Sequence, residues 1–417
     1  MKKKMGLSTK IVIGMFAGVV LGLLFGSYIN VFQIVGDIFM RLLTMAVVPL
    51  IFINIIAGIT QMDDIKGFGR TGIKLFIYYL CTMTVAVMLG VIFGFLIEPG
   101  VGLVLDQAAK PPSPEKITFI KVITDFFPAN GIGAMAQGKL VQVILFAIFI
   151  GIATLMLPAE EKKRISGFFT LMAKLMIRLI MIIMELSPYG IAALTAVTVA
   201  KFGTSIFGPL AKFVIAIYLA MIVQVLIVYF PVLFAFVRIW PLEFIRRSAP
   251  IWITAATTCS SQATLPVEME TAQNKMGLPA KIVNFALPLG ATMNSDGNAA
   301  WFGLIAVFTA QIFGLPMDAG SILQVAFLGV VLCLGSPGLP GGIFVATAIF
   351  MTALGYPIEV SAMLMGIFRV MDIGLTIMNT TGDVVGVFVV SGIEKEFDRK
   401  TSSYWDAAPT NPKVDAI

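Results

Sequence analysis

Long apolar runs separated by short polar segments dominate this chain of 417 residues. The first three runs cover about residues 11–29, 38–59 and 75–97, each close to the roughly 20 residues that an α-helix needs to cross a bilayer. A membrane β-barrel would alternate apolar and polar residues along each strand, whereas these runs are continuous. The chain is therefore predicted to be an all-α polytopic membrane protein.

The composition excludes several other classes. Apolar residues make up 58% of the chain and charged residues only 12%, about half the charged share of a soluble domain. A soluble enzyme, a disordered protein and a coiled coil are therefore excluded. The chain has no histidine, so imidazole metal ligands and histidine proton relays are excluded as well. Cys81, Cys259 and Cys333 are widely spaced and fit neither a disulfide framework nor a zinc site, so we expect small interior residues.

The basic residues predict the orientation in the membrane. Lysines and arginines cluster at positions 2–10, 66–70, 162–164 and 238–247, whereas residues 26–36 carry none. Positive charge in cytoplasmic loops then places the N-terminus in the cytoplasm, and the polar tail at 394–417 is expected there too. The first run lacks a cleavage site and is expected to be a retained span. Residues 98–139 are expected to form a long external loop, and further runs cover 140–157, 168–200 and 210–237.

After residue 245 the hydrophobic segments are interrupted in their middles. The interruptions are TTCSSQ at 257–262, MNSDGN at 293–298, GSPGLPGG at 335–342 and NTTGD at 379–383. Irregular backbone at membrane depth is tolerated only where it is buried in protein or lines a polar cavity. Residues 245–315 and 318–395 each contain a broken segment followed by a helix with a broken polar patch. This repeat predicts a binding site between its two copies.

Two of these segments are candidate re-entrant hairpins. The first is either a hairpin with its tip at Ser260 and Ser261 or a kinked span, and its sequence favours neither. A hairpin tip would present free backbone NH groups to a carboxylate. The second, GSPGLPGG, cannot continue a helix and is either an external loop or a hairpin tip. The apolar runs on both of its sides favour the hairpin.

Intramembrane carboxylates are the strongest signal of function. Asp372, Thr376, Asn379 and Asp383 follow one another at helical spacing and share one face. Asp372 has an alternative structural role, because Arg369 lies three residues before it and could pair with it. Asp296 and Asp383 have no basic neighbour in sequence, and an ionised carboxylate in apolar surroundings is costly. Because their neighbours offer oxygen atoms, a hard cation such as Na⁺ is the predicted counter-charge.

Four motifs in order resemble those of the dicarboxylate/amino acid:cation symporters. They are TLP at 264–266, LPLGAT-x-N-x-DG at 287–297, GSPGLPGG, and D-x-x-x-T-x-x-N-x-T-G-D at 372–383, within a similarity that runs from about residue 8 to 395. The resemblance implies eight transmembrane helices, two re-entrant hairpins, inverted repeats, a homotrimer and an elevator mechanism. It implies a scaffold at 1–74 and 140–200 and a transport domain at 75–97 and 201–395. The loop at 98–139 is then external and the tail at 396–417 cytoplasmic.

The resemblance also implies site residues. Asp372 corresponds to the residue that holds the substrate ammonium, and Asn379 to the one that binds the α-carboxylate. The other implied substrate residues are Cys259, Ser260, Ser261, Asn298, Leu339, Ile343, Leu375 and Thr376. The first sodium site would use Asp383, Asn294, Asn379 and Gly290, and the second Asp296, Tyr79, Thr82 and Asn294. Carbonyl groups of Thr292, Cys333, Leu334 and Ser336 would form a third site when the second hairpin closes.

The chain departs from the family pattern at four positions. Leu375 stands where members that carry acidic amino acids have an arginine, and Asn298 replaces a threonine that touches the same side-chain carboxylate. Ser295 replaces a methionine, and Met83 replaces a hydroxyl residue beside the second sodium site. An acidic side chain would therefore lack its bidentate arginine.

The sequence thus predicts Na⁺-coupled uptake of a neutral or polar amino acid, or a related zwitterion, across the cell membrane of a prokaryote. The alternative is a symporter for acidic amino acids or dicarboxylates, with protons as the other coupling ion. A channel and an intramembrane enzyme are the rivals from other classes, and the chain lacks the nucleophile–base pair that such an enzyme needs. No cofactor and no nucleic-acid partner are expected.

Overall fold

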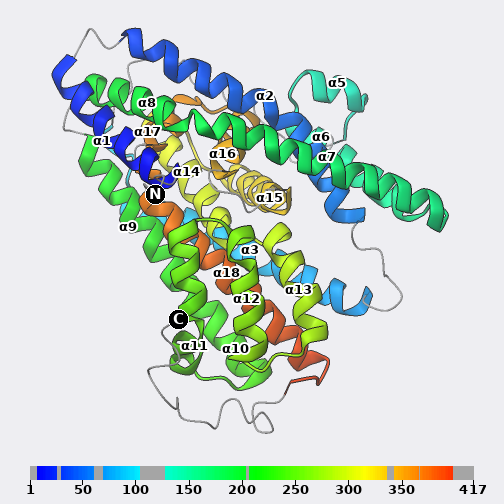
Figure 1. Ribbon diagram of the computed structural model, residues 1–417. Helices are drawn as coiled ribbons and strands as arrows, with labels where there is room; N and C mark the ends of the chain where they lie inside the picture. Colours follow the sequence, from blue (N-terminus) through cyan, green and yellow to red (C-terminus); the bar gives the residue numbers. More distant parts are fainter. Residues whose placement is uncertain are drawn as a thin grey trace, which may run out of the picture.

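The computed structural model describes residues 7–25, 30–60, 69–103, 127–202, 206–335, 342–365 and 367–397. Within these ranges every regular element is a helix (Figure 1). By length and composition, four helical stretches are able to cross a membrane: Thr71–Ile97, Ala159–Ile183, Phe207–Val237 and Phe368–Ile393. The all-α membrane prediction agrees with these observations.

Five helices form a first packing group, which lies across the upper part of Figure 1. They are α1 (Leu7–Phe25), α2 (Asn30–Thr60), α6 (Leu140–Leu155), α7 (Ala159–Glu185) and α8 (Ser187–Phe202). α1 packs along α8, and α2 packs against α6, α7 and α8. The short helix α5 (Gly131–Ala136) contacts α6 and lies in the described part of the predicted external loop.

The second group surrounds α18 (Phe368–Ile393), which is buried along most of its length. Its other members are α3 (Gly69–Ile97), α9 (Phe207–Gln224), the π-helix η3 (Val225–Tyr229), α10 (Phe230–Val237), α11 (Pro241–Thr258), α12 (Ser261–Asn274), α13 (Ala280–Met293) and α14 (Asp296–Phe313). α18 is in direct contact with α3, α9, α10, α11, α12, α13 and α14. Figure 1 shows α18 running between α3 and α12. Helices α15 (Ala319–Gly335) and α16 (Gly342–Ala353) contact both groups, and α17 (Glu359–Met365) packs on α8.

The first broken segment forms a helical hairpin. α11 and α12 lie side by side, and the hydroxyl groups of Thr258 and Thr264 are 3.2 Å apart across the turn. Cys259 closes α11 in the left-handed conformation (φ 48°, ψ 45°), and the Ala263 amide donates to Ser260 Oγ at 3.2 Å to cap α12. A kinked span would place the two halves end to end, so the hairpin alternative is the one observed. The tip of the second candidate hairpin, residues 336–341, lies outside the described residues.

The polar patch at 379–383 does not interrupt its helix, so the predicted break there is wrong. α18 continues from Phe368 to Ile393, and its hydroxyl side chains find their acceptors within the same helix. Thr380 Oγ1 donates to the Thr376 carbonyl at 3.0 Å, and Thr381 Oγ1 donates to the Ile377 carbonyl at 2.6 Å. The break in α13–α14 is real, since α13 ends at Met293 and α14 begins at Asp296.

Two further expectations need correction. The single run at 168–200 is divided between α7 and α8, because Pro188 has no amide hydrogen and suits only the first turn of a new helix. Cys81 is exposed, whereas Cys259 and Cys333 are buried as expected. Cys81 lies on the same outer face of α3 as the exposed Thr84 and Val85, so that apolar run has one face outside the core.

Two glycines bring α3 and α14 close together. A Cβ added at Gly90 would clash with the Ala300 carbonyl oxygen, and one at Gly303 with the Val87 carbonyl oxygen. Small residues of this kind allow membrane helices to pack backbone against backbone.

Gly303→Leu is therefore expected to lower the thermal unfolding midpoint of the purified protein strongly, since overpacking a core costs about 1–3 kcal/mol or more. The measurement is size exclusion after heating in detergent. Gly167→Leu on α7 is the matched control, because a Cβ there meets no atom within 4 Å. An unchanged midpoint for Gly303→Leu would contradict the observed packing.

Candidate functional site

The break between α13 and α14 meets α18 through a network of buried amides and carboxylates. The Gly297 amide donates to Asn379 Oδ1 at 2.8 Å. Asn294 Nδ2 donates to Asp383 Oδ1 at 2.9 Å and to the Asn379 carbonyl at 3.2 Å. Asn294, Asn379 and Asp383, predicted from distant motifs, are thus brought together in the second packing group.

Two glycines make this close approach possible. A Cβ at Gly290 would lie 2.5 Å from Tyr79 Oη and 2.7 Å from Asp383 Oδ1, so these two oxygens flank the backbone of α13. A Cβ at Gly382 would lie 2.7 Å from both Asp296 Oδ2 and Tyr229 Oη. A side chain at either position would displace the oxygen atoms that the two predicted sodium sites use.

Several oxygen atoms in this region are buried and have no hydrogen-bond partner among the described residues. They are Tyr79 Oη, Gln224 Oε1, Asn294 Oδ1, Asp296 Oδ1 and Asp383 Oδ2. Unpartnered buried polar atoms are uncommon because each one loses its hydration without compensation. Carboxylate, amide and hydroxyl oxygens are also the donors that hard cations prefer. The donor set fits bound Na⁺, and it leaves carboxylate charge to be neutralised.

Asp296 is held by a residue that the sequence analysis missed. The Tyr229 hydroxyl donates to Asp296 Oδ2 at 2.5 Å and lies 3.4 Å from the Met378 carbonyl. The Thr82 side chain also interacts with the Asp296 carboxylate. Tyr229 lies 67 positions before Asp296, within the otherwise apolar stretch 225–237, and its only sequence signal is a phenol within that stretch.

Asp372 forms an ion pair with Arg369, which is the alternative structural role that the sequence allows. Arg369 Nη1 lies 3.5 Å from Asp372 Oδ2, and Arg369 Nη2 donates to the Thr257 carbonyl at 3.4 Å. Cys259 at the hairpin turn also interacts with Asp372. The predicted amino-group anchor is therefore next to the tip of the α11–α12 hairpin and shares its charge with a neighbouring guanidinium.

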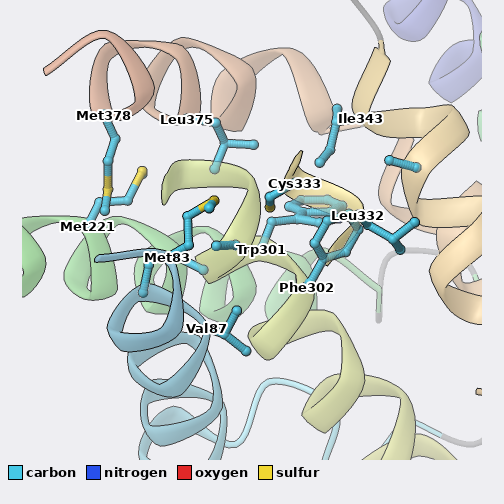
Figure 2. Packing of buried hydrophobic residues seen from close by; sticks show 14 of the residues in the cluster. Met83, Val87, Met221, Trp301, Phe302, Leu332, Cys333, Ile343, Leu375 and Met378 are labelled. Atoms are coloured by element: carbon cyan, nitrogen blue, oxygen red, sulfur yellow. The ribbon is translucent and has the colours of Figure 1, made fainter. Parts of the chain in front are cut away.

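The residues predicted to lie near the substrate side chain belong to an apolar cluster. Figure 2 shows Leu375 of α18, Ile343 of α16 and Cys333 of α15 gathered with Trp301 and Phe302 of α14. Leu375 is 1% exposed and Ile343 is 4% exposed. A charged substrate group placed here would need a counter-charge from outside this cluster.

The other predicted site residues have mixed positions. Ser261 and Thr376 are buried, while Asn298 and Leu334 are partly buried. Thr292 turns its hydroxyl back to the carbonyl groups of Pro288 and Leu289 in its own helix. Leu339 and Ser336 lie outside the described residues.

Glu268 is a further buried acid that the sequence analysis missed. It is fully buried on α12, and neither carboxylate oxygen has a hydrogen-bond partner among the described residues. It interacts electrostatically with Asp383. Two ionised carboxylates in these surroundings would repel each other, so a cation or a proton must neutralise one of them. An acid between apolar residues just after TLP was the signal available in sequence.

Buried oxygens without a described partner at an interrupted helix, beside a helical hairpin in a membrane fold, are typical of secondary transporters. The chain belongs to the Sodium:dicarboxylate symporter family, whose profile matches residues 7–393. It is therefore a transporter and not an enzyme.

Three curated relatives cover nearly the whole chain. The Proton/glutamate-aspartate symporter of Escherichia coli K12 is 31% identical over an alignment of 405 residues, which covers 91% of this chain and 92% of the relative. The Proton/sodium-glutamate symport protein of Geobacillus stearothermophilus is 28% identical, over 97% of this chain and 98% of the relative. The C4-dicarboxylate transport protein of Bacillus subtilis 168 is 29% identical, over 96% of this chain and 97% of the relative.

Proposed function

We propose that this protein couples the inward movement of Na⁺ to the uptake of an α-amino acid across the cytoplasmic membrane of a prokaryote. The observation that carries the proposal is the group of buried oxygens without described partners around Asn294, Asp296 and Asp383. Asp372 lies on the same helix as Asp383, about three turns before it. Asp372 offers the anion that a substrate ammonium needs, and Asn379 offers an amide to its carboxylate. The name of one relative, proton/sodium-glutamate symport protein, supports Na⁺ as the coupling ion.

In this proposal, ion and substrate strengthen each other's binding. Na⁺ neutralises Asp383 and Asp296 and fixes the amides of Asn294 and Asn379, which both bond across α13, α14 and α18. The substrate then meets an ordered site, and the α15–α16 pair closes over it. Such mutual affinity gain is a reciprocal coupling free energy between two sites.

The proposed architecture is eight transmembrane helices with two re-entrant hairpins, assembled as a homotrimer that works by an elevator mechanism. The two packing groups support a static scaffold from residues 1–74 and 140–200 and a moving domain from 75–97 and 201–395. Both termini are proposed to be cytoplasmic.

The geometry favours a substrate with a neutral or polar side chain. Leu375 and Ile343 belong to the apolar cluster of Figure 2, so they offer dispersion contacts and no charge. An acidic side chain placed against them would carry an unpaired buried charge, which costs several kcal/mol.

A second candidate, an acidic amino acid, is favoured by Arg369. Its guanidinium lies at Asp372 and at the hairpin carbonyl of Thr257, and it would become available to a substrate carboxylate once an ammonium pairs with Asp372. The names of the relatives, which include glutamate, aspartate and C4-dicarboxylates, also favour this candidate. A dicarboxylate without an amino group would meet the charge of Asp372 directly.

Uptake of a radiolabelled amino acid into proteoliposomes tests the function. We expect concentrative uptake that needs an inward Na⁺ gradient, and a competition panel of neutral, polar and acidic amino acids then ranks the substrates. Uptake that does not exceed equilibrium would indicate a channel. Uptake that follows a proton gradient without Na⁺ would overturn the assignment of the ion.

Changing Leu375 tests the basis of specificity. Leu375→Arg should weaken the binding of neutral substrates, because an uncompensated guanidinium would face them. Combined with Asn298→Thr it should give measurable aspartate binding by isothermal titration. Micromolar aspartate or glutamate binding by the parent would instead establish the acidic candidate, and Arg369→Met should then abolish it.

A further inference from the structure

A π-helical turn interrupts the long helix that α9, η3 and α10 form. Residues Val225–Tyr229 make up η3, and the Phe230 amide donates to the Val225 carbonyl five residues back. In an α-helix with 3.6 residues per turn, residues five apart diverge by roughly 140° around the axis. A turn with i→i+5 bonds stacks them instead, and such turns are frequent at functional sites. Gln224 and Tyr229 therefore share one face of this helix.

Gln224 presents a free oxygen in the buried interior. It is 0% exposed, and its Nε2 donates to the Thr82 carbonyl at 3.0 Å. Because a carbonyl can only accept a hydrogen bond, the amide must turn its NH₂ group to Thr82. Its Oε1 then faces away and has no partner among the described residues.

Tyr229 reaches the same site from the other end of the turn. Its hydroxyl donates a hydrogen bond to Asp296 Oδ2, so Asp296 Oδ1 is the carboxylate oxygen without a described partner. Thr82 links the two residues, since its carbonyl accepts from Gln224 Nε2 and its hydroxyl, which donates to the Tyr79 carbonyl at 3.2 Å, also interacts with the Asp296 carboxylate. Gln224, Thr82, Asp296 and Tyr229 thus form one connected buried network.

The neighbouring position on α3 does not supply a hard ligand. Met83 follows Thr82, is fully buried, and offers a thioether sulfur, which suits soft metals better than Na⁺. A cation at Asp296 therefore needs another neutral oxygen. Gln224 Oε1 has no partner among the described residues, and Gln224 Nε2 donates to the carbonyl of the same Thr82.

We propose that the π-turn adds two residues to the Asp296 cation site: Gln224 as a neutral oxygen ligand and Tyr229 as a positioning residue that holds the carboxylate. This inference rests on the proposed Na⁺ coupling and assigns a role to a helix segment outside the family motifs. The π-turn is then the structural reason why two residues five apart serve one ion.

Na⁺ binding to the purified protein tests the inference without any transport assay. NaCl titrations, with choline chloride at matched ionic strength, are followed by isothermal titration and by the rise in Tm that a bound ion produces. Gln224→Met should weaken apparent Na⁺ affinity by about tenfold, the effect of losing one good oxygen contact, and should change the ratio of Li⁺ to Na⁺ affinity. Tyr229→Phe should weaken Na⁺ binding several-fold.

Two matched controls separate the ion site from general packing. Gln311→Met removes an amide that likewise donates to a carbonyl of α3, Gly94 at 2.9 Å, but whose Oε1 already accepts from the Gly100 amide. Tyr218→Phe removes a phenol of α9 that donates to the Val370 carbonyl at 2.6 Å, outside the network. Both controls should keep the parental Na⁺ affinity and the parental Li⁺ to Na⁺ ratio.

The outcomes are distinguishable. If the parent binds Na⁺ and Asp296→Asn does not, but Gln224→Met titrates like Gln311→Met, the inference is wrong and the proposed function stands. A parent without any Na⁺ response overturns both. If size exclusion shows that Gln224→Met does not fold, Tyr229→Phe decides, and a parental Na⁺ affinity and cation ratio for that variant would overturn the inference.

Discussion

Asp372→Asn is expected to abolish the binding of amino acid substrates while the variant elutes from size exclusion at the parental volume. Asn keeps the shape of the side chain but removes the charge that pairs with a substrate ammonium. Losing one partner of a buried ion pair costs about 3–5 kcal/mol, which is a loss of at least a hundredfold in affinity. Isothermal titration of the purified protein at saturating Na⁺ measures the effect.

The observed pair with Arg369 makes the control essential. If Asp372 served only to hold Arg369, then Arg369→Met would damage substrate binding as much as Asp372→Asn, and the Asp372 variant would misfold. In the neutral-substrate proposal, Arg369→Met leaves the Asp372 carboxylate free for the ammonium and should preserve or strengthen binding. Substrate binding by Asp372→Asn at the parental affinity would contradict the anchor role.

Asp383→Asn and Asp296→Asn are each expected to weaken Na⁺ dependence severely. Both residues are fully buried, and each has one carboxylate oxygen with no partner among the described residues. A charged ligand contributes at least about 1.5–3 kcal/mol, so the Na⁺ concentration for half-maximal uptake should rise tenfold or more. Uptake in proteoliposomes across a NaCl series measures it.

Asp318→Asn is the charge-matched control for these two variants. Asp318 is exposed before α15 and accepts hydrogen bonds from the Ser321 amide at 2.8 Å and hydroxyl at 2.7 Å. These bonds lower the pKa of Asp318 below its ordinary value, so its substitution also removes one negative charge at neutral pH. It should leave the Na⁺ response unchanged. Parental Na⁺ curves for both Asp383→Asn and Asp296→Asn would end the assignment of the ion sites.

The apolar runs were sufficient to predict a helical membrane protein, and the motifs were sufficient to predict its family. Continuous stretches of membrane length predict spans because a buried backbone must bond within its own helix. The spacing of Asp372, Thr376, Asn379 and Asp383 predicts one face of α18, because helical periodicity is a local property of the chain. Both predictions agree with the helix that the structure describes. The substrate preference and the domain roles stay predictions.

The tertiary structure decided which polar groups have partners. Gln224 of α9 and Tyr229 of η3 reach the region of Asp296. Glu268 approaches Asp383 from α12, and Arg369 pairs with Asp372. Sequence spacing allowed the Arg369 pair without requiring it, and it contained no trace of the π-turn. Whether a buried oxygen is satisfied depends on side chains that distant helices bring within 3 Å or so, and local periodicity carries no information about that distance.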